Sequence, residues 1–291
     1  MSLIQRYAVY RLASNTVFYL PVLILVFRLR VDSIELALAL VSVYTVAVAI
    51  AELPSGLIAD TLGYRATLAL GLVSALLGTL LLAVGQSFLM LALAQVFGAV
   101  AFSLRSGTES VYLYDLLANQ ALYQRYEGRT SAANYFALSI SSAAGSVLYS
   151  LDALAPFALT LIAASVALAF LLSLPHRREN ASARRPSPLQ VVRQASLSLI
   201  GRRGVLPLLS VFALLLTATA LVYWTYQLFL DHLGLPTSLF GLLYAVGFIA
   251  SASGSWVAEE LNKWLGFRSA LLLAILTTSG TMVAMGSATG W

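Results

Sequence analysis

The sequence predicts an all-α membrane protein, a bundle of long apolar helices that cross a lipid bilayer. Of its 291 residues, 60% are hydrophobic and 10% are charged, whereas soluble domains carry roughly 25% charged residues. The mean hydropathy is +0.87. Apolar runs of about 17 to 25 residues recur along the chain, and each is long enough to cross about 30 Å of hydrocarbon at about 1.5 Å per residue. The bilayer is therefore the expected solvent.

The apolar runs predict nine spans, six before and three after one long polar connection that holds seven arginines. The first run is too long for a signal peptide and lacks a small-residue cleavage pattern, so we interpret it as a span. The expected domains are a six-helix bundle at 1–174, a basic cytoplasmic linker at 175–204 and a partial three-helix bundle at 205–291. The nine spans are expected at 12–27, 36–57, 67–84, 88–114, 131–149, 154–174, 206–230, 240–257 and 270–287.

The basic residues predict the orientation. With a cytoplasmic N-terminus, fourteen of the seventeen Lys and Arg residues lie on the cytoplasmic side, Arg28 and Arg30 lie outside, and Arg105 lies within a span. This bias follows the positive-inside rule, so we expect a multi-pass protein of the plasma membrane with a cytoplasmic N-terminus. The fourteen are Arg6, Arg11, Arg65, Arg125, Arg129, the seven arginines of the linker, Lys263 and Arg268.

The arginine-rich linker joins two membrane blocks and lacks interleaved aromatic residues. It is therefore expected to face anionic lipid headgroups and not nucleic acid. Inside the spans, small residues recur at four-residue spacing, which lets helix backbones approach closely in lipid. Examples are Gly71 with Ala75, Ser74 with Gly78, and Ala137 with Ser141 and Gly145.

A loop between the second and third spans has the pattern G-x-x-x-D-x-x-G-x-R, formed by Gly56, Asp60, Gly63 and Arg65. Gly56 permits close helix contact, and Gly63 supplies a backbone conformation that other residues resist. Asp60 and Arg65 place opposite charges at the cytoplasmic mouth, where they can pair in one state of the protein and separate in another. A solvated turn is the alternative interpretation of such a segment.

This pattern resembles the signature loop of the major facilitator superfamily, and the fourth span, ending in Tyr114-Asp115, is similar to that of efflux-type bacterial members. The resemblance implies a charge relay between Asp115 and Arg65 across a cytoplasmic gate. Family members normally have twelve spans in two related halves, so we expect a chain truncated after nine spans, or a variant completed by another chain. Leu265-Gly266-Phe267-Arg268 is a looser echo of the loop and supports duplication.

Arg105 and Glu109 lie within the fourth predicted span, where each charge costs on the order of 3 kcal/mol and therefore suggests a partner or a wet cavity. Their four-residue spacing places them on one helical face, where they can neutralise each other. A structural ion pair and a substrate or proton site remain open. We expect Glu109 to be the proton carrier, because a buried carboxyl group that loses its arginine partner favours its neutral form.

In the family, the first, fourth, seventh and tenth helices line a central cavity. Aromatic rings beside a carboxylate suit an amphipathic or cationic ligand, although aromatic residues near span ends also serve as interfacial anchors. By resemblance, the residues that line the cavity here are Asn15, Tyr19, Arg105, Glu109, Tyr112, Tyr223, Trp224, Tyr226 and Gln227.

Other classes of function lack their motifs. The chain has no cysteine, and it contains no H-E-x-x-H, no G-x-S-x-G and no Walker loop, so we expect no enzyme, no ATP-driven pump, no metal and no cofactor. The expected function is secondary transport of a small molecule by alternating access, as a proton-coupled efflux antiporter. A non-transporting receptor or scaffold, or an inactive truncated transporter, is the alternative.

Overall fold

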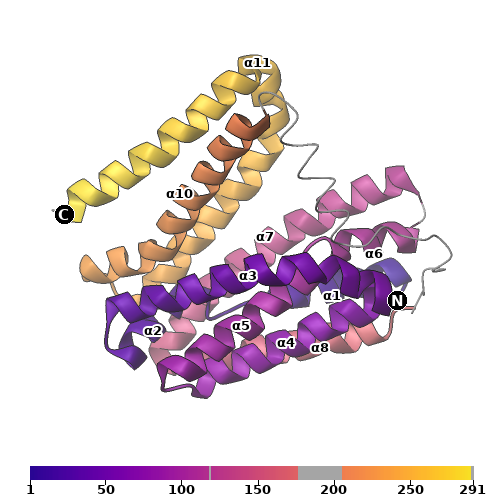
Figure 1. The fold of residues 1–291 in the computed structure, drawn as a ribbon, viewed down its shortest axis with the longest axis horizontal. Coiled ribbons are helices and arrows are strands. Elements are labelled where there is room, and N and C mark those ends of the chain that lie inside the picture. Colours follow the sequence, from indigo (N-terminus) through magenta and orange to yellow (C-terminus); the bar gives the residue numbers. More distant parts are fainter. Residues whose placement is uncertain (118, 176–204, 290–291) are drawn as a thin grey trace. The chain divides into compact units, whose positions relative to one another are not determined.

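The computed structural model describes residues 1–117, 119–175 and 205–289, and these residues form helices and no strands (Figure 1). The all-α prediction is therefore confirmed for this part of the chain. The helices are α1 (Leu3–Asn15), η1 (Leu20–Val22), α2 (Leu23–Val31), α3 (Ile34–Leu62), α4 (Tyr64–Val84), α5 (Phe88–Arg105), α6 (Thr108–Leu117), α7 (Gln120–Leu151), α8 (Ala155–Leu172), α10 (Val205–His232), η2 (Thr237–Leu239) and α11 (Phe240–Thr289).

Six described segments are long and apolar enough to cross a membrane, so the protein is a multi-pass membrane protein. The predicted span at 131–149 lies within α7, which is 32 residues long but less apolar, because serine, glycine and alanine fill much of this stretch. The last two predicted spans fall on the shorter apolar segments Thr237–Ser251 and Ser269–Ala284. The six are Leu3–Val31, Ile34–Leu62, Tyr64–Val84, Phe88–Leu117, Ala155–Leu172 and Leu209–His232.

The first span begins earlier than predicted. Helix α1 starts at Leu3, where the Ser2 side chain accepts a hydrogen bond from the Gln5 amide and the Gln5 side chain accepts one from the Ser2 amide. This capping box satisfies two amides that a helix start leaves unpaired. Arg11, expected on the cytoplasmic side, therefore lies inside the span Leu3–Val31.

The described helices form two compact units. One contains α1 to α8, η2 and the start of α11, and the other contains α10 and the remainder of α11. The grouping of 235–252 with the first unit differs from the expected boundary, which assigns all of 205–291 to one bundle. The division at 1–174, 175–204 and 205–291 stays a prediction, and nearly all of the linker lies outside the described residues.

Small residues bring helices of the first unit into close contact. A Cβ added at Gly78 of α4 would lie 3.1 Å from the carbonyl oxygen of Ala94 in α5. Ser74 Oγ donates a hydrogen bond to the carbonyl of Phe97 at 2.7 Å. In lipid, where no hydrophobic effect drives helices together, such backbone approach is a main source of packing energy. The predicted role of the small residues is confirmed here.

The start of α11 packs on α7 in the same way. A Cβ at Gly241 would lie 1.8 Å from the Ser142 carbonyl oxygen, so only glycine fits. Ser146 Oγ donates a hydrogen bond to the Ser238 carbonyl at 2.9 Å. A Cβ added at Gly145 of α7 would clash in the same way with the carbonyl oxygen of Phe18.

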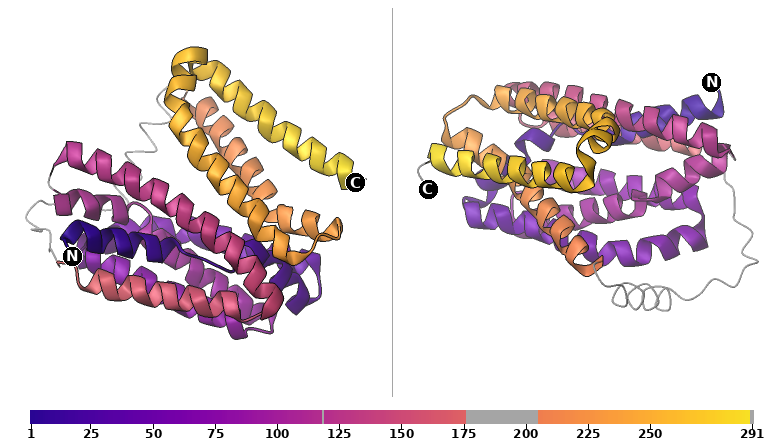
Figure 2. Two further views of the ribbon diagram at one scale, coloured as in Figure 1. Left: turned by 180° about the vertical axis from the view of Figure 1, so that it is seen from behind. Right: turned by 90° about the horizontal axis from the view of Figure 1, so that it is seen from above.

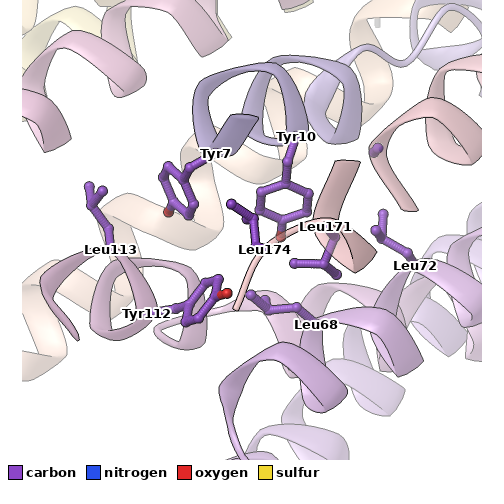
Figure 3. Packing of buried hydrophobic residues seen from close by; sticks show 9 residues of the cluster. Tyr7, Tyr10, Leu68, Leu72, Tyr112, Leu113, Leu171 and Leu174 are labelled. Atoms are coloured by element: carbon purple, nitrogen blue, oxygen red, sulfur yellow. The ribbon is translucent and has the colours of Figure 1, made fainter. Parts of the chain in front are cut away.

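A cluster of buried tyrosine and leucine side chains joins α1, α4, α6 and α8 (Figure 3). The Tyr7 ring of α1 contacts both the Tyr10 ring of the same helix and the Tyr112 ring of α6, whose centroid is 6.2 Å from that of Tyr7. Tyr112 also donates a hydrogen bond from its hydroxyl to the Pro175 carbonyl at 2.8 Å. The cluster consists of Tyr7, Tyr10, Leu68, Leu72, Tyr112, Leu113, Ala167, Leu171 and Leu174.

Two glycines with positive φ end helical segments in similar ways. Gly63, between α3 and α4, has φ 84° and ψ 154°. Gly266, inside α11, has φ 74° and ψ 158°. This backbone region is open to glycine and strained for other residues. At Gly266 the helix doubles back on itself, as Figure 2 shows for the segments 253–265 and 267–289.

Candidate functional site

The fourth predicted span is interrupted beside its charged residues. Helix α5 ends at Arg105 and α6 begins at Thr108, with Gly107 between them at φ 73°. The fourth predicted span is present as Phe88–Leu117, but it consists of two helices, because Gly107 allows a turn that a helix cannot contain. Arg105 and Glu109 nevertheless pair across this turn, with Arg105 Nε 2.9 Å from Glu109 Oε1. Their pairing was predicted, whereas its geometry was not.

Four side chains hold Glu109 of α6, three at its carboxylate and one at its backbone carbonyl. Arg105 and the Tyr10 hydroxyl, at 2.8 Å, donate to its Oε1. Arg11 of α1 places Nη1 2.6 Å from its Oε2. The Tyr7 hydroxyl donates to the Glu109 backbone carbonyl at 2.8 Å. Both carboxylate oxygens of this 8% exposed residue thus have charge-assisted hydrogen bonds, which are stronger than neutral ones.

Arg105 connects α5 to α1. Its Nη1 donates to the Ser14 carbonyl, and its Nη2 donates to Ser14 Oγ, both at 3.0 Å. With the bond to Glu109, the guanidinium group uses all three of its nitrogens. Such saturation is what a cation needs when it is removed from water.

Arg11 connects the pair to α7. Its Nη2 lies 3.5 Å from Glu127 Oε1, which also accepts a hydrogen bond from Ser110 Oγ at 3.2 Å. With its amide oxygen turned toward α1, Asn134 accepts from Arg11 Nε at 3.1 Å. The charge network therefore consists of Arg11, Arg105, Glu109 and Glu127, and its two positive and two negative charges balance.

Sequence reasoning missed Arg11 and Glu127 as site residues. Arg11 was expected at the cytoplasmic edge, but it is 8% exposed within the first span. A signal existed, since Tyr7, Arg11 and Ser14 follow the i, i+4, i+7 spacing of one helical face. Glu127 precedes the predicted fifth span and had no such signal.

A cavity of about 250 Å³ adjoins the charge network on one side. Three of the predicted cavity residues, Asn15, Arg105 and Glu109, line it. A second cavity, of about 360 Å³, lies between α1 and α7 and is lined by residues that include Arg11, Tyr126 and Asn134. The smaller cavity is lined by Arg11, Asn15, Phe102, Arg105, Ser106, Gly107, Glu109 and Ser110.

The remaining predicted cavity residues lie elsewhere. Tyr19 stacks on Phe157, with ring centroids 5.2 Å apart, and Tyr112 belongs to the buried tyrosine and leucine cluster. Neither lines the smaller cavity. The four predicted residues of the seventh span lie on α10, in the second unit, so their part in a shared cavity stays a prediction. They are Tyr223, Trp224, Tyr226 and Gln227.

The signature loop has its predicted position between α3 and α4. Gly56 lies inside α3, but a Cβ added there would meet no described atom within 4 Å, so its predicted role in close helix contact is wrong. Asp60 is exposed near the end of that helix, and Gly63 has the expected positive φ. Arg65 donates from Nη1 to the Leu174 carbonyl, just after α8, at 2.7 Å. Asp115 lies in α6, and its relay with Arg65 stays a prediction.

Nothing in the described part of the chain suggests a metal centre, since no three His, Asp or Glu side chains gather there. Long apolar helices around a buried, charge-balanced network and a polar cavity define the class of polytopic membrane transporters.

Comparisons with known proteins give the family. The family model described as Major Facilitator Superfamily matches residues 7–291, so the chain belongs to this superfamily of secondary transporters and is not an enzyme. Among solved structures, the crystal structure of a D-xylose-proton symporter matches with a TM-score of 0.65 and 13% identity. The match covers 90% of this chain and 68% of that one, and it shows a shared fold. No curated protein matches the sequence.

Proposed function

We propose that this protein exports a small amphipathic or cationic compound in exchange for protons, by alternating access across the plasma membrane of a bacterium. The observation that carries the proposal is the balanced charge network beside the 250 Å³ cavity. Buried charges in a membrane protein mark transport pathways by default, because facing hydrocarbon would cost several kcal/mol. The N-terminus would be cytoplasmic, as the distribution of basic residues indicates.

The charge network suits coupling between a proton and a helix movement. It joins α1, α5, α6 and α7 through side chains alone. A proton that neutralises one carboxylate leaves the two guanidinium groups unbalanced, so the favoured arrangement of the helices changes. A ligand or proton can shift a conformational equilibrium only through such a difference in interaction energy between states. The D-xylose symporter that shares this fold is coupled to protons, which supports the same coupling here.

The cavity lining supports the proposed class of substrate. Phe102 offers an apolar and aromatic surface, Asn15 and Ser106 offer hydrogen bonds, and Glu109 adds a carboxylate that Arg11 and Arg105, in the same lining, hold in ion pairs. An aromatic face next to a carboxylate attracts organic cations. Asp115 and Arg65, with Asp60 and the two loop glycines, would form the cytoplasmic gate, and the aromatic residues of α10 would complete the binding site.

The test uses the full chain in liposomes and ethidium, a fluorescent amphipathic cation. We expect ethidium movement driven by an imposed pH gradient. Glu109→Gln should lower it about tenfold or more, which corresponds to about 1.4 kcal/mol. The control is Arg105→Gln combined with Glu109→Gln, which keeps the charges balanced and should fold yet remain inactive. Movement that ignores the pH gradient would contradict proton coupling, and a folded but inactive wild type would favour the receptor or inactive-transporter alternative.

A further inference from the structure

The two carboxylates of the charge network differ in their partners. Both oxygens of Glu109 accept hydrogen bonds or ion pairs, from Arg11, Arg105 and Tyr10. Glu127 engages only Oε1. Its Oε2 is shielded from solvent and accepts no hydrogen bond from the described residues. A buried polar atom without a partner is costly, so this oxygen is the least satisfied part of the network.

Arg11 is shared unequally between the two acids. It lies 2.6 Å from Glu109 Oε2 and 3.5 Å from Glu127 Oε1. A proton on Glu109 would weaken two close ion pairs, whereas a proton on Glu127 would weaken one long pair. A proton on Glu127 would therefore disturb fewer and longer contacts than a proton on Glu109.

The surroundings of Glu127 contain few other ionisable groups. Helix α1 presents Arg11 and Tyr7, which both interact with it electrostatically, and α6 presents Ser110 directly and Glu109 on the far side of Arg11. Helix α8, which also packs on α7, contains no ionisable residue. Arg11 is thus the one close cation that can respond to the charge of Glu127 within the described residues.

We propose that Glu127 is the residue of this network that takes up and releases the proton, while Glu109 stays ionised as the fixed partner of Arg11 and Arg105. The proton binds Oε2 from one side of the membrane and leaves to the other, with no other bond made or broken. This assignment rests on the proposed transport function and deepens it.

Arg11 gives this proton a structural consequence. It is the residue that the 250 Å³ and 360 Å³ cavities share in their linings. Neutral Glu127 no longer attracts Nη2, so Arg11 is drawn fully to Glu109, and the link between α1 and α7 loosens. Protonation of Glu127 on α7 would therefore move Arg11, the residue that lies between the two cavities.

The experiment detects the proton directly. Infrared difference spectra of the full chain in liposomes, recorded between pH about 8 and about 5, should show the carbonyl stretch of a newly protonated, buried carboxyl group. Glu127→Gln should remove this band. Glu109→Gln should retain the band but move its midpoint to lower pH, because Arg11 is then free to pair with Glu127. Glu52→Gln, a matched control at an exposed acid outside the network, should leave the band unchanged. Should Glu127→Gln fail to fold, Glu127→Asp should shift the midpoint of the band and Glu109→Asp should not.

The outcomes separate this inference from the proposed function. A band that survives Glu127→Gln and is lost in Glu109→Gln would overturn the inference and leave proton-driven transport intact. A wild type that lacks the band would overturn the inference as well. A band assigned to Glu127 in a protein that moves no ethidium would support the proton site and count against the proposed substrate.

Discussion

The charge network and the signature loop contain the same kinds of residues, acids and arginines, but they are held in different ways. In the network, the Arg11 and Glu109 side chains are 10% and 11% exposed and contact other charged side chains. In the loop, Asp60 is exposed and Arg65 donates to a backbone carbonyl. Charge balance therefore governs the network, because a buried charge needs its partner, whereas backbone geometry at Gly63 governs the loop.

The largest effect should come from unbalancing the network. Among the described residues, Glu109→Gln leaves Arg105 without an acidic partner and Arg11 with Glu127 alone. Removal of one member of a buried ion pair costs about 3 to 5 kcal/mol. Thermal unfolding in detergent should show a clearly lower midpoint. The double variant with Arg105→Gln should recover part of this loss, and equal stability of the single and double variants would refute the balance argument.

An intermediate effect should come from the backbone of the loop. Gly63→Ala forces a side chain into φ 84° and ψ 154°, at a cost of about 1 to 3 kcal/mol. Gly56→Ala is the matched control, since a Cβ there meets nothing within 4 Å and alanine favours a helix by about 0.5 to 1 kcal/mol. The same unfolding measurement should give opposite signs for the two variants. If both variants changed the stability in the same direction, the space around the new side chain, and not φ, would determine the effect.

The smallest effect should come from a loop side chain. Arg65→Gln removes the hydrogen bond to the Leu174 carbonyl, which is worth about 0.5 to 1.5 kcal/mol. Arg125→Gln, at an exposed position of α7, should change stability by less than about 0.5 kcal/mol. If Arg65→Gln proved as harmful as Glu109→Gln, the contrast between network and loop would fail.

Local sequence patterns predicted much of the fold. Hydropathy indicated the long helices, small-residue spacing indicated the close contact between α4 and α5, and the G-x-x-x-D-x-x-G-x-R pattern located the turn at Gly63. Gly266, in the segment that matches this pattern less closely, has nearly the same φ and ψ as Gly63. These features depend on neighbours in the chain, so a single sequence contains them.

The network was predicted only at Arg105 and Glu109, which are four residues apart. Its other contacts join residues far apart in the chain, with 99 positions between Tyr10 and Glu109 and 116 between Arg11 and Glu127. No local pattern encodes such pairs. Hydropathy also misled, because it assigns an arginine to the end of a span, whereas Arg11 is compensated inside one. The interruption at Gly107 moved Tyr112 into the apolar cluster, away from the predicted cavity.

At Gly63 and Gly266, the handedness of the amino acid decides whether a substitution is tolerated. Gly63 and Gly266 occupy a region of backbone space that suits the mirror image of a natural amino acid. Every genetically encoded replacement meets the same obstacle there, whether it is polar, apolar or charged. Replacement of each of these glycines by all other amino acids should therefore lower stability to a similar extent in every case. At lipid-facing positions, by contrast, the loss should depend on the polarity of the new side chain.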